Sequence, residues 1–380
     1  MTCPGCGEAA RCVGLRDKQV LSLLGTLRLN RHYYPCQGCQ PGCCPWEKVL
    51  RLADQRLTPA AREVVCLTGV QASFGQVANR TLDKLTGLRL CESSVQRLTE
   101  AAGTFLKEQQ AQGLLLGPAR PYDWHRDAQE VRCAYVSVDL TGILMQGEKS
   151  AKRDGRMVTV GMIYNPQPRQ ADEEALSKPC DGVRYGAGFY DLDELGLEMR
   201  RQAGQVGMNE ATQWIALTDG GAGLERFLDV NFPRAEKILD FHHAAEHLHA
   251  FAKQYRPGKG AEPLAKAWCH SLKHAGGRQV IRMLERLPRR IMSAEVSDAH
   301  AKLLNYLQNN VHRLDYPRYL KRGWQIASGA VESACKRVVN QRLCLGGMRW
   351  GEEGSDAVAH LRALFLSDPD QWDAFWAMAA

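Results

Sequence analysis

Three carboxylates, Asp139, Asp219 and Glu332, are the residues whose surroundings best suit catalysis. Asp139 follows a valine-rich run, and Asp219 follows a second apolar run just before a Gly-Gly turn. Aspartates at the ends of neighbouring buried strands can share divalent ions, because the sheet fixes their separation. Two such ions about 3.5–4 Å apart activate a water or 3′-hydroxyl and stabilise the leaving oxygen in phosphodiester displacement. The sequence therefore predicts a Mg²⁺ (or Mn²⁺) site, against the alternative that each aspartate is a turn or capping residue.

Glu332 belongs to a segment with helical spacing of apolar residues. Val331, Cys335, Val338 and Val339 form a packing stripe, which places Glu332 at the edge of that stripe. A glutamate on a helix that packs against a sheet is well placed to complete a metal site. The alternative is an ordinary exposed helix glutamate.

A second set of potential metal ligands lies at the start of the chain, where seven of the 14 cysteines fall within 44 residues. The pairs Cys3-x-x-Cys6 and Cys36-x-x-Cys39 are separated by 29 residues, which contain an expected hairpin around Gly25. Four thiolates from two such pairs suit tetrahedral Zn²⁺, and binding helps to fold a module too small to stand alone. The alternative ligands, or spare thiols, are Cys12, Cys43 and Cys44.

A cluster of histidines follows Asp240. His243-x-x-Glu246-His247 matches a zinc-peptidase pattern, in which two histidines one turn apart bind zinc and the glutamate activates water. Five-residue patterns often arise by chance, and this helix carries other histidines. We therefore prefer a charged helix face or a DNA-proximal histidine cluster.

Charge is unevenly distributed along the 380 residues, whose formal net charge is +7. Residues 131–250 carry 13 basic and 18 acidic side chains, whereas residues 251–326 carry 15 basic and 5 acidic ones, a net +10. This division suits an enzyme acting on a polyanion, since one part grips phosphates and the other supplies carboxylates for metal. The alternative is a solvated helical face. The candidate phosphate contacts in the basic block are Arg278, Arg282, Arg286, Arg289 and Arg290.

The elements before residue 112 are expected to bind DNA. Helical spacing appears at 59–67, at 74–85 and again from about residue 93, and the short connection between the last two predicts a helix-turn-helix. Its polar residues Gln96 and Arg97 suit a major groove, although a plain helical hairpin is the alternative. On the hairpin, Arg28 and Arg31 suit phosphate contact, and ordinary strand packing is equally compatible with them.

The central part of the chain has β periodicity after a Gly- and Pro-rich stretch, 113–130, that predicts a linker. Apolar runs and helical segments follow in the order β-β-β-α-β-α-β, and everything after residue 242 has helical spacing. The expected strands are 131–138, 143–145, 157–164, 214–217 and 237–240, and the expected helices are 192–203 and 224–230. The stretch 165–191 is expected to be a loop.

Composition excludes three broad classes. With 44% hydrophobic and 24% charged residues, the chain is not wholly disordered. It contains no run of about 18 apolar residues, which excludes a transmembrane helix. Its start has neither a basic nor an apolar segment typical of a signal peptide, so we expect a cytoplasmic protein with reduced cysteines.

Taken in order, these motifs resemble a bacterial insertion-sequence transposase of the DDE type, most closely the ISKra group, with a Mutator-like catalytic core. The resemblance covers nearly the whole chain. The matching residues are Cys3-Pro4-Gly5-Cys6 with Tyr33-Tyr34-Pro35-Cys36-Gln37-Gly38-Cys39, Val138-Asp139, Leu217-Thr218-Asp219-Gly220, Asp240-Phe241-His242-His243-Ala244-Ala245-Glu246-His247-Leu248, Ser328-Gly329-Ala330-Val331-Glu332-Ser333 and Arg342-Leu343-Cys344-Leu345-Gly346-Gly347-Met348-Arg349-Trp350.

The resemblance implies a multidomain chain of the α+β or α/β class with an RNase H-like mixed-sheet core. It implies that Asp139, Asp219 and Glu332 form the catalytic triad, and that His243 orients the scissile phosphate or a metal ligand. The implied domains are a zinc ribbon (1–50), a helix-turn-helix domain (51–112), a linker (113–130), the first part of the core (131–250), a basic all-α insertion (251–326) and C-terminal core helices (327–380).

We therefore expect a DNA transposase that cleaves strands and transfers them, with Mg²⁺ in the core and structural Zn²⁺ in the ribbon. Its partner would be double-stranded DNA, at element ends and target, and it would act as a homodimer or larger assembly at the bacterial nucleoid. One alternative is a transposase-derived DNA-binding protein that has lost cleavage. The other is a zinc peptidase that uses His243, Glu246 and His247.

Overall fold

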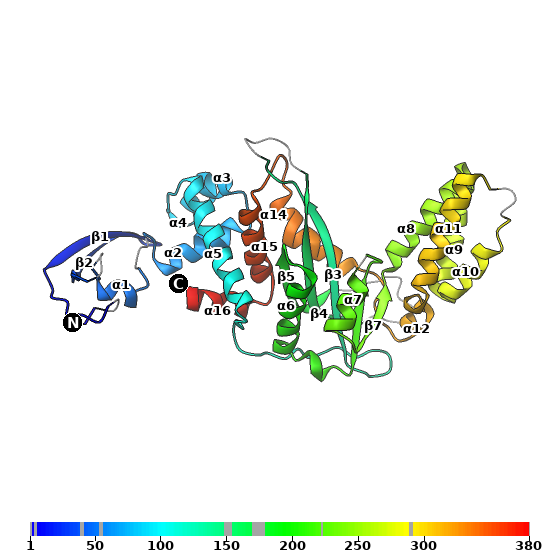
Figure 1. Ribbon diagram of the computed structural model, residues 1–380, viewed down its shortest axis with the longest axis horizontal. Coiled ribbons are helices and arrows are strands. Elements are labelled where there is room, and N and C mark those ends of the chain that lie inside the picture. Colours follow the sequence, from blue (N-terminus) through cyan, green and yellow to red (C-terminus); the bar gives the residue numbers. More distant parts are fainter. Residues whose placement is uncertain are drawn as a thin grey trace. The chain divides into compact units, whose positions relative to one another are not determined.

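The computed structural model describes residues 2–3, 6–38, 42–52, 56–147, 154–168, 179–221, 223–288 and 292–379. The chain folds into two compact units. The first contains Met1–Gln109, Glu352–Phe365 and Pro369–Ala380, and the second contains Gln110–Gly351 and Leu366–Asp368. Figure 1 shows the elements of both, coloured along the sequence.

The first unit begins with an antiparallel hairpin of β1 (Leu15–Ser22) and β2 (Gly25–His32), which confirms the predicted hairpin. Gly25 has a φ of 109°, a value that favours glycine. The Ser22 hydroxyl donates to the Gly25 carbonyl (2.8 Å) and accepts from the Leu24 amide (3.1 Å). The two-residue turn is therefore closed by a side chain as well as by the strand ladder.

Helices make up the rest of the first unit, and the predicted helical regions before residue 112 are confirmed. They are α1 (Pro45–Val49), α2 (Pro59–Gly69), α3 (Phe74–Gln76), the π-helical η1 (Val77–Thr81), α4 (Leu82–Thr86), α5 (Glu92–Ala111), α15 (Glu352–Leu366) and α16 (Pro369–Ala379). Gly87, with a φ of 71°, ends α4 and starts the short connection to α5.

Helices α15 and α16 belong to the first unit, so the segment 327–380 is divided between the units, although it was expected to lie wholly in the catalytic core. Gly103 of α5 permits this packing, because a Cβ there would overlap the Ala357 carbonyl of α15. An ion pair of 2.5 Å joins Lys107 to Asp356 in the same contact. The sequence of α15 has many apolar residues but does not say which element they pack against.

The second unit is built on a five-stranded mixed sheet in the order β5-β4-β3-β6-β7. Strand β4 is antiparallel to β3 and β5, whereas β6 and β7 continue parallel to β3. The strands are β3 (Cys133–Ile143), β4 (Arg156–Pro166), β5 (Cys180–Gly188), β6 (Gln213–Thr218) and β7 (Ala235–Leu239). The expectation of a mixed α and β chain with a mixed sheet is confirmed.

Two features of this sheet differ from the prediction. Strand β3 runs unbroken for 11 residues, so the prediction of a separate strand at 143–145 is wrong, and Asp139 lies within a strand. Strand β5 forms inside the expected loop 165–191. Its glycines have low β propensity, but Gly182 is needed there, because a Cβ would come within 2.8 Å of the Tyr122 ring.

Helices cover both faces of the sheet. One face packs on α6 (Leu192–Gln205) and α7 (Leu224–Asn231), and the buried Trp124 joins this core, so the expected linker 113–130 is packed structure. The segment α13 (Gly329–Ala334) and the π-helical η7 (Cys335–Asn340) contact β3 and β4. Because side chains alternate along a strand, the Val138 side chain belongs to the α6 core and Asp139 to the opposite, α13–η7 face.

The helical part of the second unit begins directly after β7. Helices α8 to α11 contact one another and lie side by side as a bundle (Figure 1). The helices and turns not yet given are η3 (Met208–Glu210), α8 (Phe241–Tyr255), η4 (Gly258–Gly260), α9 (Ala261–Ala275), α10 (Gly277–Glu285), α11 (Ala294–Asn309), η6 (Val311–Arg313), α12 (Tyr316–Lys321) and α14 (Gln341–Leu343). Within the described ranges, every helix is too short or too polar to cross a membrane.

Candidate functional site

The register of β3 and β6 places the two predicted catalytic aspartates beside each other. The last pair in this parallel ladder is Ser137 with Leu217. Asp139 and Asp219 each lie two residues beyond that pair. They therefore occupy equivalent positions on neighbouring strands, where side chains point to the same face of a sheet.

A pocket of about 130 Å³ contains all three predicted carboxylates, Asp139 from β3, Asp219 from the end of β6 and Glu332 from α13. Its other lining residues are Val138, Asp240, His242, His243, Glu246, Ser328 and Val331. The fold thus gathers acidic residues that are far apart in the sequence, together with the predicted His243.

Two donors orient the Asp139 carboxylate. The Leu140 amide donates to Oδ1 at 2.7 Å, and the Cys335 thiol of η7 donates to Oδ2 at 3.6 Å. Burial raises the pKa of Asp139 above its ordinary value, the Leu140 bond opposes that shift, and the negative charges of Asp219 and Glu332 add to it. A divalent cation would relieve this repulsion, which is the electrostatic setting of a metal site.

The other two carboxylates are also held by local bonds. The Gly221 amide donates to Asp219 Oδ1 at 2.9 Å, and the Ser328 hydroxyl donates to Glu332 Oε1 at 2.7 Å. Ser328 stands one turn before Glu332, so the motif that contains them orients its own acid.

The pocket acids do not form a closed cage. No three pocket side chains bring one ligand atom each within 4.8 Å of one another; among the described residues, a cysteine group in the first unit alone meets that limit. Magnesium is commonly bound through one or two carboxylates while it keeps several waters. The spacing therefore suits hydrated ions shared with a substrate better than one fully enclosed ion.

Asp240 lines the pocket but serves as a structural cap. It is 2% exposed, and its carboxylate accepts the amides of His243 (2.8 Å) and Ser328 (2.8 Å). The first bond caps the N-terminus of α8, and the second ties α8 to the segment that carries Glu332. This gives the Asp240-x-x-His243 spacing a physical cause, because a capping aspartate bonds the amide three residues on.

The peptidase pattern does not assemble a metal site. His243 Nδ1 lies 4.0 Å from Glu246 Oε2, and the His243 and His247 rings meet edge to face at 4.9 Å between centroids. Burial, followed by the charge of His243, lowers the pKa of His247. The three residues are absent from the metal-compatible groupings of the described residues, so the geometry gives the zinc-peptidase alternative no support.

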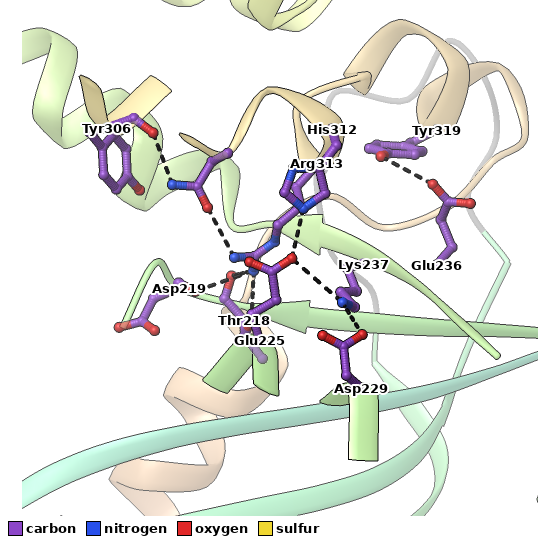
Figure 2. A network of polar contacts seen from close by, with 11 residues as sticks. Thr218, Asp219, Glu225, Asp229, Glu236, Lys237, Tyr306, His312, Arg313 and Tyr319 are labelled. Atoms are coloured by element: carbon purple, nitrogen blue, oxygen red, sulfur yellow. Dashed lines mark hydrogen bonds and ion pairs between the residues drawn. The ribbon is translucent and has the colours of Figure 1, made fainter. Parts of the chain in front are cut away.

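Arg313, which the sequence did not single out, is buried against the Asp219 strand end (Figure 2). Its guanidinium donates to the Thr218 hydroxyl at 2.7 Å and to the carbonyls of Thr218 and Asp219 at 3.2 Å. The preceding residue, His312, contacts Glu225 of α7 at 2.8 Å. The end of the basic helical segment is therefore bonded directly to the strand that carries a catalytic candidate.

An aromatic contact closes the same strand end from another side. A Cβ on Gly220 would come within 2.8 Å of the Tyr306 ring of α11, so glycine is required for this approach. The Tyr306 ring in turn stacks on His247, with 4.1 Å between centroids. Together with Arg313, this contact explains why an Asp-Gly pair follows β6.

The cysteine group lies in the first unit. Cys3, Cys6 and Cys36 place their sulfurs within 4.8 Å of one another, and Cys6 and Cys36 are 3.3 Å apart. Tetrahedral zinc with Zn–S bonds of about 2.3 Å needs sulfurs about 3.8 Å apart, so small adjustments accommodate the ion. The predicted fourth ligand, Cys39, lies outside the described residues.

The alternative thiol ligands lie apart from this group. Cys12 contacts His32 Nδ1 at 3.4 Å, and Cys43 pairs with Tyr34 in an isolated bridge. Burial raises the pKa of the Cys44 thiol. Among the described residues, therefore, only Cys3, Cys6 and Cys36 are gathered for a metal.

The predicted DNA contacts differ in their surroundings. Arg31 is turned onto Glu47 of α1, which also binds Lys18, so its guanidinium has a structural partner. The exposed members of the predicted set are Arg28, Gln96, Arg97, Arg278, Arg282 and Arg286. Arg289 and Arg290 lie outside the described residues.

Comparisons with known proteins give little further information. No protein-family model matches the chain, and no curated protein sequence matches it. Among solved structures, it is weakly similar to the Drosophila P element transposase strand transfer complex, at 12% identity and a TM-score of 0.26. That match covers 76% of this chain and 65% of the other, less than two thirds of its length. A TM-score of this size does not establish a common fold.

Proposed function

We propose that this chain cleaves and joins DNA strands in a metal-dependent reaction, as a DDE-type transposase does. The observation that carries the proposal is the pocket in which Asp139 and Asp219 share a register on adjacent parallel strands while Glu332 enters from α13. The strand order β5-β4-β3-β6-β7, with β4 antiparallel, supports an RNase H-like core for the second unit.

Asp139, Asp219 and Glu332 would hold Mg²⁺ or Mn²⁺, since hard divalent ions prefer carboxylate oxygens. When bound, such ions activate a water or a 3′-hydroxyl and stabilise the leaving oxygen of a phosphodiester. The chain supplies the positioning: Leu140 and Cys335 orient Asp139, and Ser328 orients Glu332.

His243 has the role of orienting the scissile phosphate in this proposal. It lines the pocket beside the acids, and its backbone is fixed by the Asp240 cap at the start of α8. The basic segment 251–326 would hold the DNA backbone, because its net charge of +10 suits a polyanion. Its exposed Arg278, Arg282 and Arg286 are the proposed phosphate contacts.

The first unit would bind double-stranded DNA at the element ends. Its cysteine group would hold a structural Zn²⁺, with Cys39 as the fourth ligand, and α5 would present Gln96 and Arg97 to the major groove. Joining two element ends needs two copies, so we expect a homodimer or a larger assembly when the protein is active.

Strand cleavage tests this proposal. The chain would be incubated with Mg²⁺ and duplex DNA carrying the inverted repeats that flank its gene. We expect nicks at the repeat ends, and their loss in Asp219→Ala and Glu332→Ala. Asp193→Ala, which removes an exposed acid of α6, is the matched control and should cleave normally. Cleavage that survives both pocket substitutions would refute the triad.

A second candidate function is DNA binding without cleavage. The observation that favours it is the spacing of the pocket acids, since no three of their ligand atoms gather within 4.8 Å. It predicts that duplex DNA binds, that no nicks form with Mg²⁺ or Mn²⁺, and that Asp139→Ala leaves the affinity unchanged. Metal-dependent nicking by the wild-type chain would exclude it.

A further inference from the structure

The turn between β1 and β2 presents two leucines to solvent. Leu24 is 96% exposed and Leu23 is 37% exposed. The turn itself does not require them, because Ser22 and Gly25 occupy the outer positions of a four-residue turn and suit them. Exposed apolar residues that local structure does not explain are expected at functional sites.

The frame around these leucines is fixed. Ser22 is 7% exposed and closes the turn through its hydroxyl. On the next residue, the Leu21 amide donates to the Arg56 carbonyl at 2.8 Å, and the Leu21 carbonyl accepts from the Thr58 amide at 2.9 Å. These bonds attach the tip of the hairpin to the start of α2. The leucines are therefore carried on an anchored strand pair and not on a free loop.

Positive charge surrounds the tip. Arg56, bonded to Leu21 through its carbonyl, has an exposed side chain, and so does Arg28 of β2. The stretch 11–34 as a whole carries five basic residues and one acidic residue. An apolar point flanked by guanidinium groups matches a partner with an apolar interior between two rows of negative charge. Stacked base pairs between two phosphate backbones have this arrangement.

We propose that Leu24, supported by Leu23, is a wedge that enters the minor groove of duplex DNA, separates two stacked base pairs and kinks the helix. Apolar side chains inserted in this way are a known means of bending DNA. Pyrimidine–purine steps are the expected targets, because they unstack most easily. The inference rests on the proposed action of the chain on DNA, and it adds how the hairpin engages the duplex.

Local unstacking can be measured without cleavage. The full-length chain would be mixed, in buffer without Mg²⁺ and without chelator, with 30-bp-scale duplexes that carry 2-aminopurine beside a central TA step. Dyes at the duplex ends would report bending by energy transfer. We expect wild-type binding to raise 2-aminopurine fluorescence and shorten the end-to-end distance.

Substitution at the tip should remove both signals. Leu24→Ala should abolish most of the fluorescence rise and the bend and weaken binding about three- to tenfold, since unstacking and the contacts that follow it partly cancel. Leu24→Phe should keep the signals, because an aromatic wedge also inserts. Leu197→Ala, at an exposed leucine of α6, is the matched control and should behave as wild type. Arg28→Ala should lower the salt dependence of binding by about one phosphate contact and keep the kink.

Three outcomes would overturn the wedge. One is equal fluorescence and bending in the wild type and Leu24→Ala while both bind. A second is a change of sedimentation coefficient in Leu24→Ala without DNA, which would make the tip a contact between copies of the chain. A third is a wild-type chain that binds no duplex at low salt, which would also refute the proposed function. Cleavage lost in the pocket variants with the kink intact concerns the pocket alone, so the two proposals fail separately.

Discussion

The cysteine group of the first unit and the carboxylate pocket of the second are both expected to bind metal, yet they are organised differently. Three sulfurs already lie within 4.8 Å of one another, whereas the pocket acids share a cavity without such convergence. The cysteines sit in a hairpin module whose small core consists of Cys3, Ala10 and Cys36. The acids are attached to a large sheet with a core of its own.

Electrostatics explains the difference. Thiols are neutral when protonated, so three of them can pack together before a metal arrives. Ionised carboxylates repel one another, and each pocket acid is held by a separate donor, Leu140, Gly221 or Ser328. A structural site can therefore be closed by its ligands, whereas a catalytic site must be held open by the fold around it.

Removing zinc should produce the largest effect, and it should be confined to the first unit. A chelator, or Cys36→Ser, should cost up to about 10 kcal/mol of local folding free energy, the scale of structural zinc binding. Amide hydrogen exchange should show loss of protection in β1 and β2 and none in β3 to β7. Ala275→Ser is a suitable control, since it alters an alanine far along the chain from the cysteines. Unchanged protection of the hairpin after chelation would contradict a structural metal.

Neutralising a pocket acid should give the opposite result, a loss of activity without a loss of stability. Asp139→Asn should lower strand cleavage about 10³-fold, because several kcal/mol of charge stabilisation by the metal are lost. Its free energy of unfolding should equal or exceed that of the wild type, since repulsion by Asp219 and Glu332 is removed. Urea unfolding and a nicking assay on the same preparation test this. A variant that is both inactive and less stable would show that Asp139 is mainly structural.

Substitution of Arg313 should affect both properties to an intermediate degree. Arg313→Met leaves the Thr218 and Asp219 carbonyls without their shared donor and should cost about 2–3 kcal/mol of stability. Arg313→Lys keeps a charge and should recover part of it. If Arg313 positions Asp219, both variants should also weaken Mn²⁺ binding to the pocket, measured by electron paramagnetic resonance. Arg318→Lys, on the exposed surface of α12, is the control.

These residues also show how far the sequence alone reaches. Its periodicity located β6, β7 and the helices that cover the sheet, and the spacing of acids and cysteines identified the residues that the fold gathers. It missed β5, because a glycine-rich strand has little β signal, and it missed Arg313 and Cys335. Arginine and cysteine have no spacing rule that marks them as partners of a distant strand end. Their positions depend on long-range packing, which a local pattern does not contain.

The pH dependence of stability should give the smallest effect and the sharpest test of the contrast between the two sites. The pKa of Asp139 is raised in the folded chain, so between its ordinary value of 3.8 and the raised value the native state binds more protons than the unfolded state. Without Mg²⁺, stability should therefore be highest below this window, fall as pH rises through it and stay lower above it. Asp139→Asn should flatten that fall, whereas Asp193→Asn should leave it in place. Saturating Mg²⁺ should offset the fall in the wild type only, because the ion favours the ionised acid. A decline that is identical in Asp139→Asn would assign it to other carboxylates and would remove the repulsion that distinguishes the pocket from the cysteine group.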